Sequence, residues 1–339
     1  MSQNSMSKAL ARSHAIARIF SLALLTGLSV LAGLAAAAAQ AQPWPQKPIT
    51  FIVPFAPGGG TDAYARPLAA QLDGQLGQRV LIENRAGAGG TLGALQASRA
   101  APDGYTFFVG AAHHAIAPSI YKKLDYDFEK DFIPVALIAR PPQVVVVHPE
   151  RVTAKTLKEF IDYARANQMN YGSAGAGTTH HLAGELFNIL AKTKLAHVPY
   201  RGAGPAMQDL VAGHVPVVFD GLGSSAPQIA NGKLRGLAVA APKRVTAFPD
   251  MPTSAEAGLP GFEVSTWYGI FAPKGTPAPI VERMTKELKA ALQLPAIKDA
   301  WERNGSDTPD VTGAQFASLV KDEIARWRKV VTEANVKLD

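Results

Sequence analysis

Short apolar segments alternate with longer amphipathic segments through most of this chain. The apolar segments are rich in β-branched and aromatic residues and are bounded by Gly or Pro, which is typical of buried strands. Strands are predicted at 49–55, 79–84, 105–110, 143–148, 195–200, 215–220 and 235–240. Between them, segments such as 179–191 carry apolar residues at helical spacing. The alternation predicts an α/β fold in which mainly parallel sheets are flanked by helices.

The last part of the chain differs from this pattern. Residues 277–292 and 316–336 are predicted as long amphipathic helices that fold back on the first part of the chain. Two turn-prone segments, Pro141-Pro142 and 258–263, are predicted crossing points between two lobes. We therefore expect one lobe made of 42–140 plus 265–339 and a second lobe made of 141–264.

The first 41 residues have the pattern of a secretory signal peptide. Lys8, Arg12 and Arg18 precede an apolar run at 19–39, and Ala39-Gln40-Ala41 follows as a cleavage site. An uncleaved membrane anchor is the alternative, because the run is about long enough to span a bilayer. The small residues directly before the cleavage site favour removal of residues 1–41. We therefore expect a periplasmic mature protein.

Composition excludes several classes of protein. The absence of cysteine excludes a lipid-anchored cysteine, disulfides and zinc–thiolate sites. The net charge of +7 at pH 7 is not gathered into a basic stripe with aromatic residues, so we expect no nucleic-acid partner. There is no G-x-S-x-G elbow and no H-E-x-x-H helix. We expect no catalytic residues and no enzyme.

Three glycine-rich turns follow predicted strands and open predicted helices, at 57–62, 86–91 and 172–178. Glycine lets backbone N–H groups approach a ligand, and a helix N-terminus adds unpaired donors and partial positive charge. None of the turns completes a Walker A or dinucleotide-binding motif. A tight turn alone is the structural alternative for any one of them. Three together predict an anion site at the carboxyl ends of the strands.

The polar residues near these turns leave alternatives open. The pairs His113-His114 and His180-His181 lack a carboxylate cluster at ligand spacing, so we expect no metal and no cofactor. Arg201 would bind a ligand acid or form a surface ion pair.

Seven segments together resemble the Bug family, the solute-binding receptors of tripartite tricarboxylate transporters. They are WPQKPITFIVPFAPGGGTDAYAR, VLIENRAGAGGTLGA, APDGYTFFVG, YGSAGAGTTHHLAGELF, HVPYRGAGPAMQDLVAGHV, FPDMPTSAEAGLPGF and YGIFAPKGTP. The resemblance spans essentially the whole chain after the signal segment. It implies a two-lobed clamshell of the type II periplasmic-binding-protein fold, with a small carboxylate held between the lobes.

The resemblance also implies ligand contacts and partners. The implied contacts on the first lobe are Phe55, Gly58, Gly59, Thr61 and Asp62, and those on the second are Ser173, Gly177, Thr178, His181 and Asp220. The ligand would be a dicarboxylate, an amino acid or an aromatic acid. A monomeric receptor would deliver it to inner-membrane permease subunits. A periplasmic sensor that presents the carboxylate to a receptor kinase and a periplasmic α/β enzyme are the alternative functions.

Overall fold

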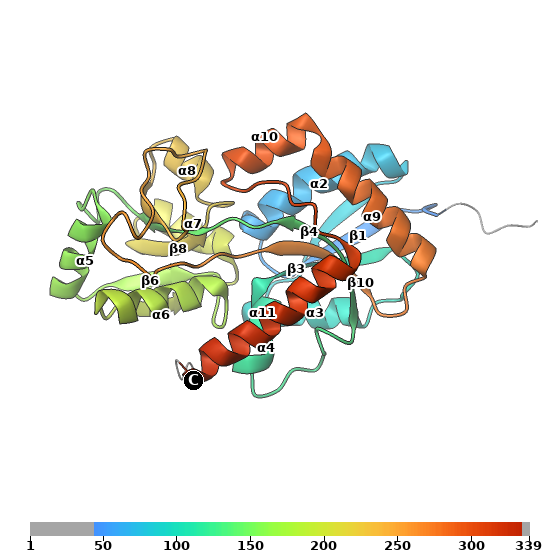
Figure 1. Cartoon of the computed structure of the whole chain (residues 1–339), viewed down its shortest axis with the longest axis horizontal. Helices are drawn as coiled ribbons and strands as arrows, with labels where there is room; N and C mark the ends of the chain where they lie inside the picture. The colour runs from blue at the N-terminus through green and yellow to red at the C-terminus, as the bar shows by residue number, and fades with distance from the viewer. Residues whose placement is uncertain (1–43, 334–339) are drawn as a thin grey trace, which may run out of the picture. The chain divides into compact units, whose positions relative to one another are not determined.

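Two five-stranded sheets organise the computed structural model, which describes residues 44–333 (Figure 1). The first sheet has the order β2-β1-β3-β10-β4 and the second has the order β7-β6-β8-β5-β9. The first contains β1 (Ile49–Val53), β2 (Val80–Asn84), β3 (Thr106–Ala111), β4 (Phe132–Ala139) and β10 (Tyr268–Pro273). The second contains β5 (Gln143–Val147), β6 (Asn170–Ser173), β7 (Ala196–Pro199), β8 (Val217–Gly221) and β9 (Arg235–Val239). Each of the seven predicted strands is present.

Each sheet is parallel except for one strand. In the first sheet β1 pairs in parallel with β2 and β3, while β10 is antiparallel to both β3 and β4. In the second sheet β6 pairs in parallel with β7 and β8, while β5 is antiparallel to both β8 and β9. Four strands of each sheet therefore run in one direction, which confirms the mainly parallel α/β fold.

The reversed strand of each sheet follows a crossing of the chain from the other sheet. The first crossing joins β4 to β5 through Pro141-Pro142, as predicted. The second crossing follows residues 258–263 and does not coincide with them as predicted. Leu259 and Phe262 still pack in the core of the second sheet. The crossings lie side by side, with the Gln143 N–H donating to the Val264 carbonyl at 2.8 Å. The lobe boundaries at 140/141 and 264/265 stay a prediction.

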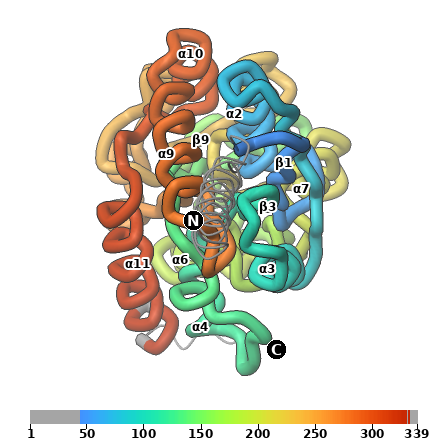
Figure 2. The backbone as a smooth tube through the Cα atoms, turned by 90° about the vertical axis from the view of Figure 1, so that its right-hand side faces the viewer, coloured from blue at the N-terminus to red at the C-terminus, as the bar shows by residue number. Residues whose placement is uncertain are grey.

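Helices flank both sheets. Those beside the first sheet are α2 (Gly60–Leu76), η1 (Ala88–Gly90), α3 (Thr91–Ser98), α4 (Ala112–Ile120), α9 (Ala278–Gln293), α10 (Pro295–Arg303) and α11 (Gly313–Glu333). Those beside the second are α5 (Leu157–Ala166), α6 (Thr179–Ala191), α7 (Ala203–Val211) and α8 (Ala226–Ala230). Figure 2 shows α9, α10 and α11 along one side and α2 and α3 along the other. Within residues 44–333, no helix has the length and apolar character needed to cross a membrane.

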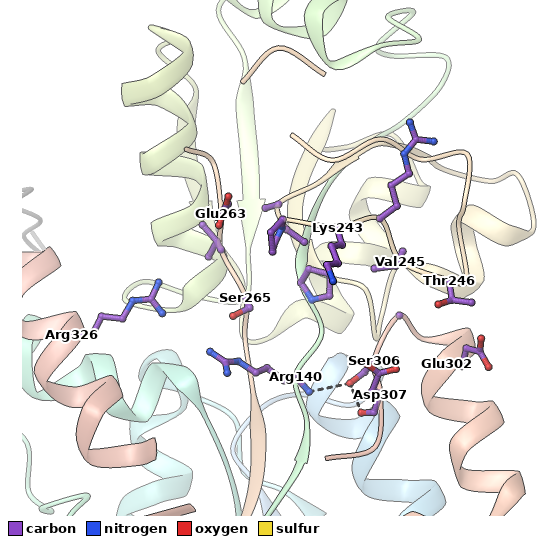
Figure 3. Close-up of a pocket in the computed structure, with 17 residues that line it drawn as sticks. Arg140, Lys243, Val245, Thr246, Glu263, Ser265, Glu302, Ser306, Asp307 and Arg326 are labelled. Carbon is purple, nitrogen blue, oxygen red and sulfur yellow. Dashed lines mark hydrogen bonds between the residues drawn. The ribbon is translucent and has the colours of Figure 1, made fainter. Parts of the chain in front are cut away.

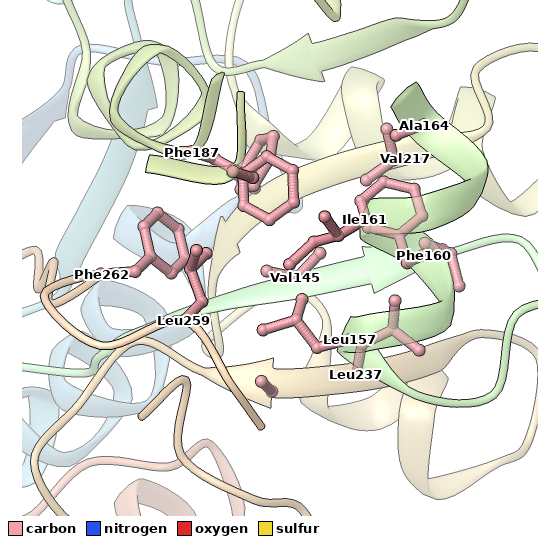
Figure 4. Packing of buried hydrophobic residues seen from close by; sticks show 14 of the residues in the cluster. Val145, Leu157, Phe160, Ile161, Ala164, Phe187, Val217, Leu237, Leu259 and Phe262 are labelled. Carbon is pink, nitrogen blue, oxygen red and sulfur yellow. The ribbon is translucent and has the colours of Figure 1, made fainter. Parts of the chain in front are cut away.

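Each sheet has its own hydrophobic core. In the second sheet, Val145 lies beneath aromatic side chains that include Phe160, Phe187 and Phe262 (Figure 4). In the first, the apolar stripe of α11 packs on the sheet, and Phe316 meets Trp267 edge-on at 5.8 Å. The C-terminal helix therefore belongs with the first sheet, as its sequence pattern predicts. The predicted helix end at residue 336 and the signal segment at 1–41 lie outside the described residues.

Candidate functional site

A small cavity lies where the N-terminal ends of four helices meet. It is lined by Phe55, Gly59, Gly60, Thr61, His113, Ala174, His180, Ala203, Thr266 and Tyr268. Its volume is about 10 Å³, which is room for about one water molecule. The lining comes from elements of both sheets, so the cavity lies between them.

The four helices present their first turns to this cavity. Gly60 and Thr61 begin α2, His113 lies in the first turn of α4, His180 lies in that of α6, and Ala203 begins α7. First-turn N–H groups have no partner within their own helix, and each helix N-terminus carries roughly half a positive charge. Two of these helices flank each sheet. Their convergence makes the cavity a candidate site for an anion or another hydrogen-bond acceptor.

The polar side chains that line the cavity are hydroxyls and imidazoles, with no lysine or arginine among the lining residues. Burial raises the pKa of the Tyr268 hydroxyl, and the negative charge of Asp220 raises it further. Tyr268 therefore remains a neutral phenol that can donate a hydrogen bond at physiological pH. Any positive potential in the cavity comes from helix ends and histidines.

His180 connects the cavity to a buried carboxylate. Its Nε2 lies 3.4 Å from Oδ1 of Asp220 and 3.4 Å from the backbone nitrogen of Gly221. Asp220 also accepts from the Ser224 hydroxyl at 2.7 and 2.8 Å. The Nδ1 atom of His180 has no hydrogen-bond partner, and neither has Nε2 of His113. Both histidines are at least nine-tenths buried.

Contacts between the two halves close the cavity. The Ala56 N–H donates to the Arg201 carbonyl at 3.1 Å, and the Tyr121 hydroxyl donates to the Ala176 carbonyl at 3.1 Å. Leu182 of α6 packs in one cluster with side chains of α4 and α11. The loops of one sheet therefore rest directly on those of the other.

The chain resembles known proteins in sequence and in fold. Residues 64–336 match the family described as the tripartite tricarboxylate transporter family receptor. The chain belongs to this receptor family. Its members include the Bug proteins, so the resemblance drawn from the sequence motifs is confirmed.

Three similar proteins illustrate the family. Protein BugT of Bordetella pertussis is 36% identical over 89% of this chain and 94% of its own length. The periplasmic binding protein BugD is 35% identical, with a TM-score of 0.84 over 87% of this chain and 99% of its own. MatC from Rhodopseudomonas palustris, solved with bound malate, is 38% identical, with a TM-score of 0.80 over 85% of this chain and 100% of its own. These receptors confirm the two-lobed type II fold and a solute-binding role.

In this receptor fold, three of the five residues predicted on the first lobe line the cavity, namely Phe55, Gly59 and Thr61. Gly58 and Asp62 instead stabilise the turn, because the Gly58 N–H donates to Asp62 Oδ2 at 3.2 Å. Asp62 also accepts from the side chains of Arg66 and Asn84. Its carboxylate is thus held within the protein, and any ligand contact by Gly58 or Asp62 stays a prediction.

Four of the residues predicted on the second lobe lie between the end of β6 and the first turn of α6, and none of them lines the cavity. Ser173 lies 2.6 Å from Nε2 of His197, and the Gly177 N–H donates to Nδ1 of His181. Thr178 caps α6 by accepting from the His181 N–H. Asp220 contacts Nε2 of His180 and does not itself line the cavity. Direct ligand contact by these five residues stays a prediction.

The sequence analysis missed several lining residues. They are His113, His180, Ala203, Thr266 and Tyr268. Gly60 and Ala174 also line the cavity, and they lie in the predicted turns 57–62 and 172–178. In α6 the family resemblance implies a contact by His181, whereas its neighbour His180 lines the cavity. Neighbouring helical residues point about 100° apart, so only one of the two side chains can face the cavity.

Two histidines outside the cavity, His114 and His197, are held neutral. Burial lowers the pKa of His114 and of His197 to about 4, and in His197 the charge of nearby His181 lowers it further. The rings of His181 and His197 stack at 4.0 Å. Among the described residues, no three His, Cys, Asp or Glu side chains are grouped to hold a metal ion.

A larger cavity of about 500 Å³ lies beside the two crossings (Figure 3). Arg140, Lys243 and Arg326 line it together with Glu263 and Glu302. Its charged side chains are of both signs and largely exposed to solvent. Such a surface gives an anion little preference over water, so the small cavity between the helix ends is the better candidate site.

Proposed function

We propose that this protein is a periplasmic receptor that captures a small carboxylate between its two lobes for delivery to a tripartite tricarboxylate permease. The observation that carries the proposal is the convergence of four helix N-termini on one closed cavity. Membership of the receptor family supports the transporter, and the bound malate of the similar protein MatC supports a carboxylate. The proposal places the ligand against α2 and α4 on one side and α6 and α7 on the other.

Helix ends are sufficient to hold an anion here. Each N-terminus contributes roughly 0.3–1 kcal/mol, and about 2 kcal/mol in a partly buried site. Hydrogen bonds to a charged group add about 1.5–3 kcal/mol each. Several such contacts together reach the roughly −8 kcal/mol of micromolar binding. The absence of a lining lysine or arginine is therefore compatible with carboxylate capture.

The volume of the cavity requires the lobes to move apart for ligand entry. A space of about 10 Å³ is far smaller than a four-carbon acid. The crossings beside Pro142 and Ser265 are the connections about which a hinge motion would occur. We propose that the protein works as a monomer, and that the ligand is released unchanged because binding and release need no covalent step.

A thermal-shift screen of a few hundred organic acids tests the proposal. At a concentration 100 times its Kd, a bound acid stabilises the folded state by about 2.7 kcal/mol. For a protein of this size we expect a rise in Tm of at least about 5 °C for one or more acids. Alcohols and amides of matched size serve as controls and should give no shift. If no acid raises Tm, the proposal is wrong.

Export is tested on the secreted protein. The pattern at 1–41 predicts a mature N-terminus at or near Gln42, so intact-mass measurement of periplasmic protein should show loss of about forty residues. A cytoplasmic sample from a secretion-blocked strain is the control and should keep Met1. Periplasmic protein that retains Met1 would contradict cleavage.

A further inference from the structure

The two crossings form a short antiparallel ribbon with a different space on each of its faces. Pro142 pairs with Ser265 in this ribbon, and both residues line the larger cavity of about 500 Å³. The next residue, Thr266, lines the small cavity between the helix ends, and its N–H donates to the Pro141 carbonyl at 3.1 Å. Neighbouring residues of an extended chain point to opposite faces. The two cavities therefore lie on opposite faces of the ribbon.

The lobes are in contact on one face of the ribbon and apart on the other. The small cavity has a volume of only about 10 Å³. The larger cavity, called the hinge groove from here on, lies between α10, α11 and the segment 240–246. A further space of about 530 Å³ separates α8 from α10. Figure 2 shows α10 and α11 along one side of the molecule and α2 and α7 along the other.

A hinge at the ribbon would couple the small cavity to the hinge groove. The small cavity cannot admit a ligand unless α2 and α7 move apart. Two bodies that rotate about a short connection separate on one side of it and approach each other on the other side. The hinge groove provides the space for this approach. Opening of the small cavity therefore narrows the hinge groove and brings the segment 240–246 toward α10 and α11.

Opposite charges face each other across the hinge groove (Figure 3). Lys243 and Glu263 extend from the side of the second sheet, and Arg140 and Asp307 lie on the side of the first. All four residues are exposed to solvent. Each side thus carries one cation and one anion that can meet a partner of opposite charge when the groove narrows.

The two sides of the hinge groove are not yet joined by these charges. Two other cations of the groove, Arg244 and Arg326, pair with Glu256 and Glu323 on their own sides. Within residues 44–333, by contrast, no ion pair crosses the groove. An exposed ion pair changes an equilibrium constant by at most roughly fivefold. New pairs across the groove are therefore strong enough to adjust the balance between open and closed lobes.

We propose that the hinge groove closes as the ligand cavity opens, and that the pairs Lys243–Asp307 and Glu263–Arg140 then hold the ligand-free protein open. The inference rests on the proposed function for its hinge motion. Closure around a ligand breaks both pairs. The measured Kd equals the Kd of the closed state divided by the closed fraction, so the hinge groove adjusts affinity without touching the ligand.

Carbodiimide cross-linking tests the first pair without any ligand. The reagent activates the Asp307 carboxylate, and the Lys243 amine attacks it to form an amide while the reagent leaves as a urea. Mass spectrometry of the digested protein measures this cross-link. The control is an oxidised Gly59→Cys/Ala203→Cys variant, because a Cβ at Gly59 would lie 3.4 Å from that of Ala203 across the small cavity. Ligand-free protein should give at least fivefold more cross-link than this locked control, and reduction of the control should restore the yield.

Charge reversal tests the same pair in solution. Spin labels at Ala70→Cys on α2 and Gln208→Cys on α7, both exposed, measure the separation of the lobes. Lys243→Glu should lower the ratio of open to closed protein by about three- to tenfold, because repulsion replaces attraction. Asp307→Lys should do the same, and the double variant should return the ratio to within about twofold of the original. Lys194→Glu, an exposed change outside the groove, is the control and should have no effect.

Salt should remove the difference between the charge variants. Exposed charges are screened at about 1 M NaCl, so the original protein and the Lys243→Glu variant should then show the same ratio of open to closed lobes. Circular dichroism verifies that each variant is folded.

Three results would overturn the inference. They are equal cross-link yields in the ligand-free protein and the locked control, lobe separations that charge reversal does not change, and a double variant in which the two reversals add. The thermal-shift screen judges carboxylate capture separately. If an acid raises Tm there while one of these results is found, the proposed function stands and only the role of the hinge groove is wrong.

Discussion

A disulfide between positions 59 and 203 is expected to lock the protein against its ligand. A Cβ atom at Gly59 would lie 3.4 Å from Cβ of Ala203, close to the roughly 3.5–4.5 Å of a disulfide. Gly59 has φ of −86°, so a cysteine fits its backbone conformation. Because the two positions belong to opposite sides of the cavity, the oxidised Gly59→Cys/Ala203→Cys variant cannot open. We expect at least a hundredfold loss of affinity for the acid that gives the largest thermal shift.

The reduced form of the same variant is the matched control. The chain has no cysteine of its own, so the introduced pair is the only possible disulfide. Addition of a reductant should restore binding to within tenfold of the weaker of the two single-cysteine variants, because both positions line the cavity. Each single-cysteine variant should bind equally with and without reductant. Full binding by protein shown by mass to be cross-linked would contradict ligand entry by opening between the lobes.

The strands that the sequence pattern missed explain the limits of the fold prediction. β4 contains Pro134, which argues against a strand in the middle of a sheet. It forms the edge of the first sheet, where a missing N–H can be tolerated. β10 contains Gly269, where any Cβ would overlap the ring of Phe316. Glycine at that position reflects close packing by a helix distant in sequence, which a local pattern does not show.

The site was only partly predictable for a similar reason. The turn before α2 could be found because its glycines, threonine and strand–helix position are adjacent in the sequence. Thr266 and Tyr268 come from the second crossing and β10, and only the order of strands in the first sheet brings them to the cavity. His180 and His181 were distinguishable only by the rotation of α6 relative to the sheet. Tertiary packing, which the sequence pattern does not specify, therefore decides these positions.

Binding is expected to depend on the glycine that begins α2 far more than on a nearby cation. A Cβ at Gly60 would overlap the hydroxyl of Tyr268, which is buried. The ring of Tyr268 packs at a tilt against that of Tyr64, with 5.4 Å between the centroids. Tyr268 cannot move aside without disturbing the wall of the cavity. Gly60→Ala should therefore reduce carboxylate affinity by at least a hundredfold in a folded protein.

Two further variants test whether the loss of affinity in Gly60→Ala is specific to the cavity. Gly74→Ala adds the same methyl group to the same helix where no atom lies within 4 Å, so it should leave affinity unchanged. Arg201→Ala removes an exposed cation that does not line the cavity, and it should cost less than tenfold. Calorimetry on the three variants, with circular dichroism to verify folding, measures each effect. If Arg201→Ala alone eliminates binding, the carboxylate is held by a side-chain ion pair. Recognition by helix N-termini would then be wrong, because backbone donors are unchanged in that variant.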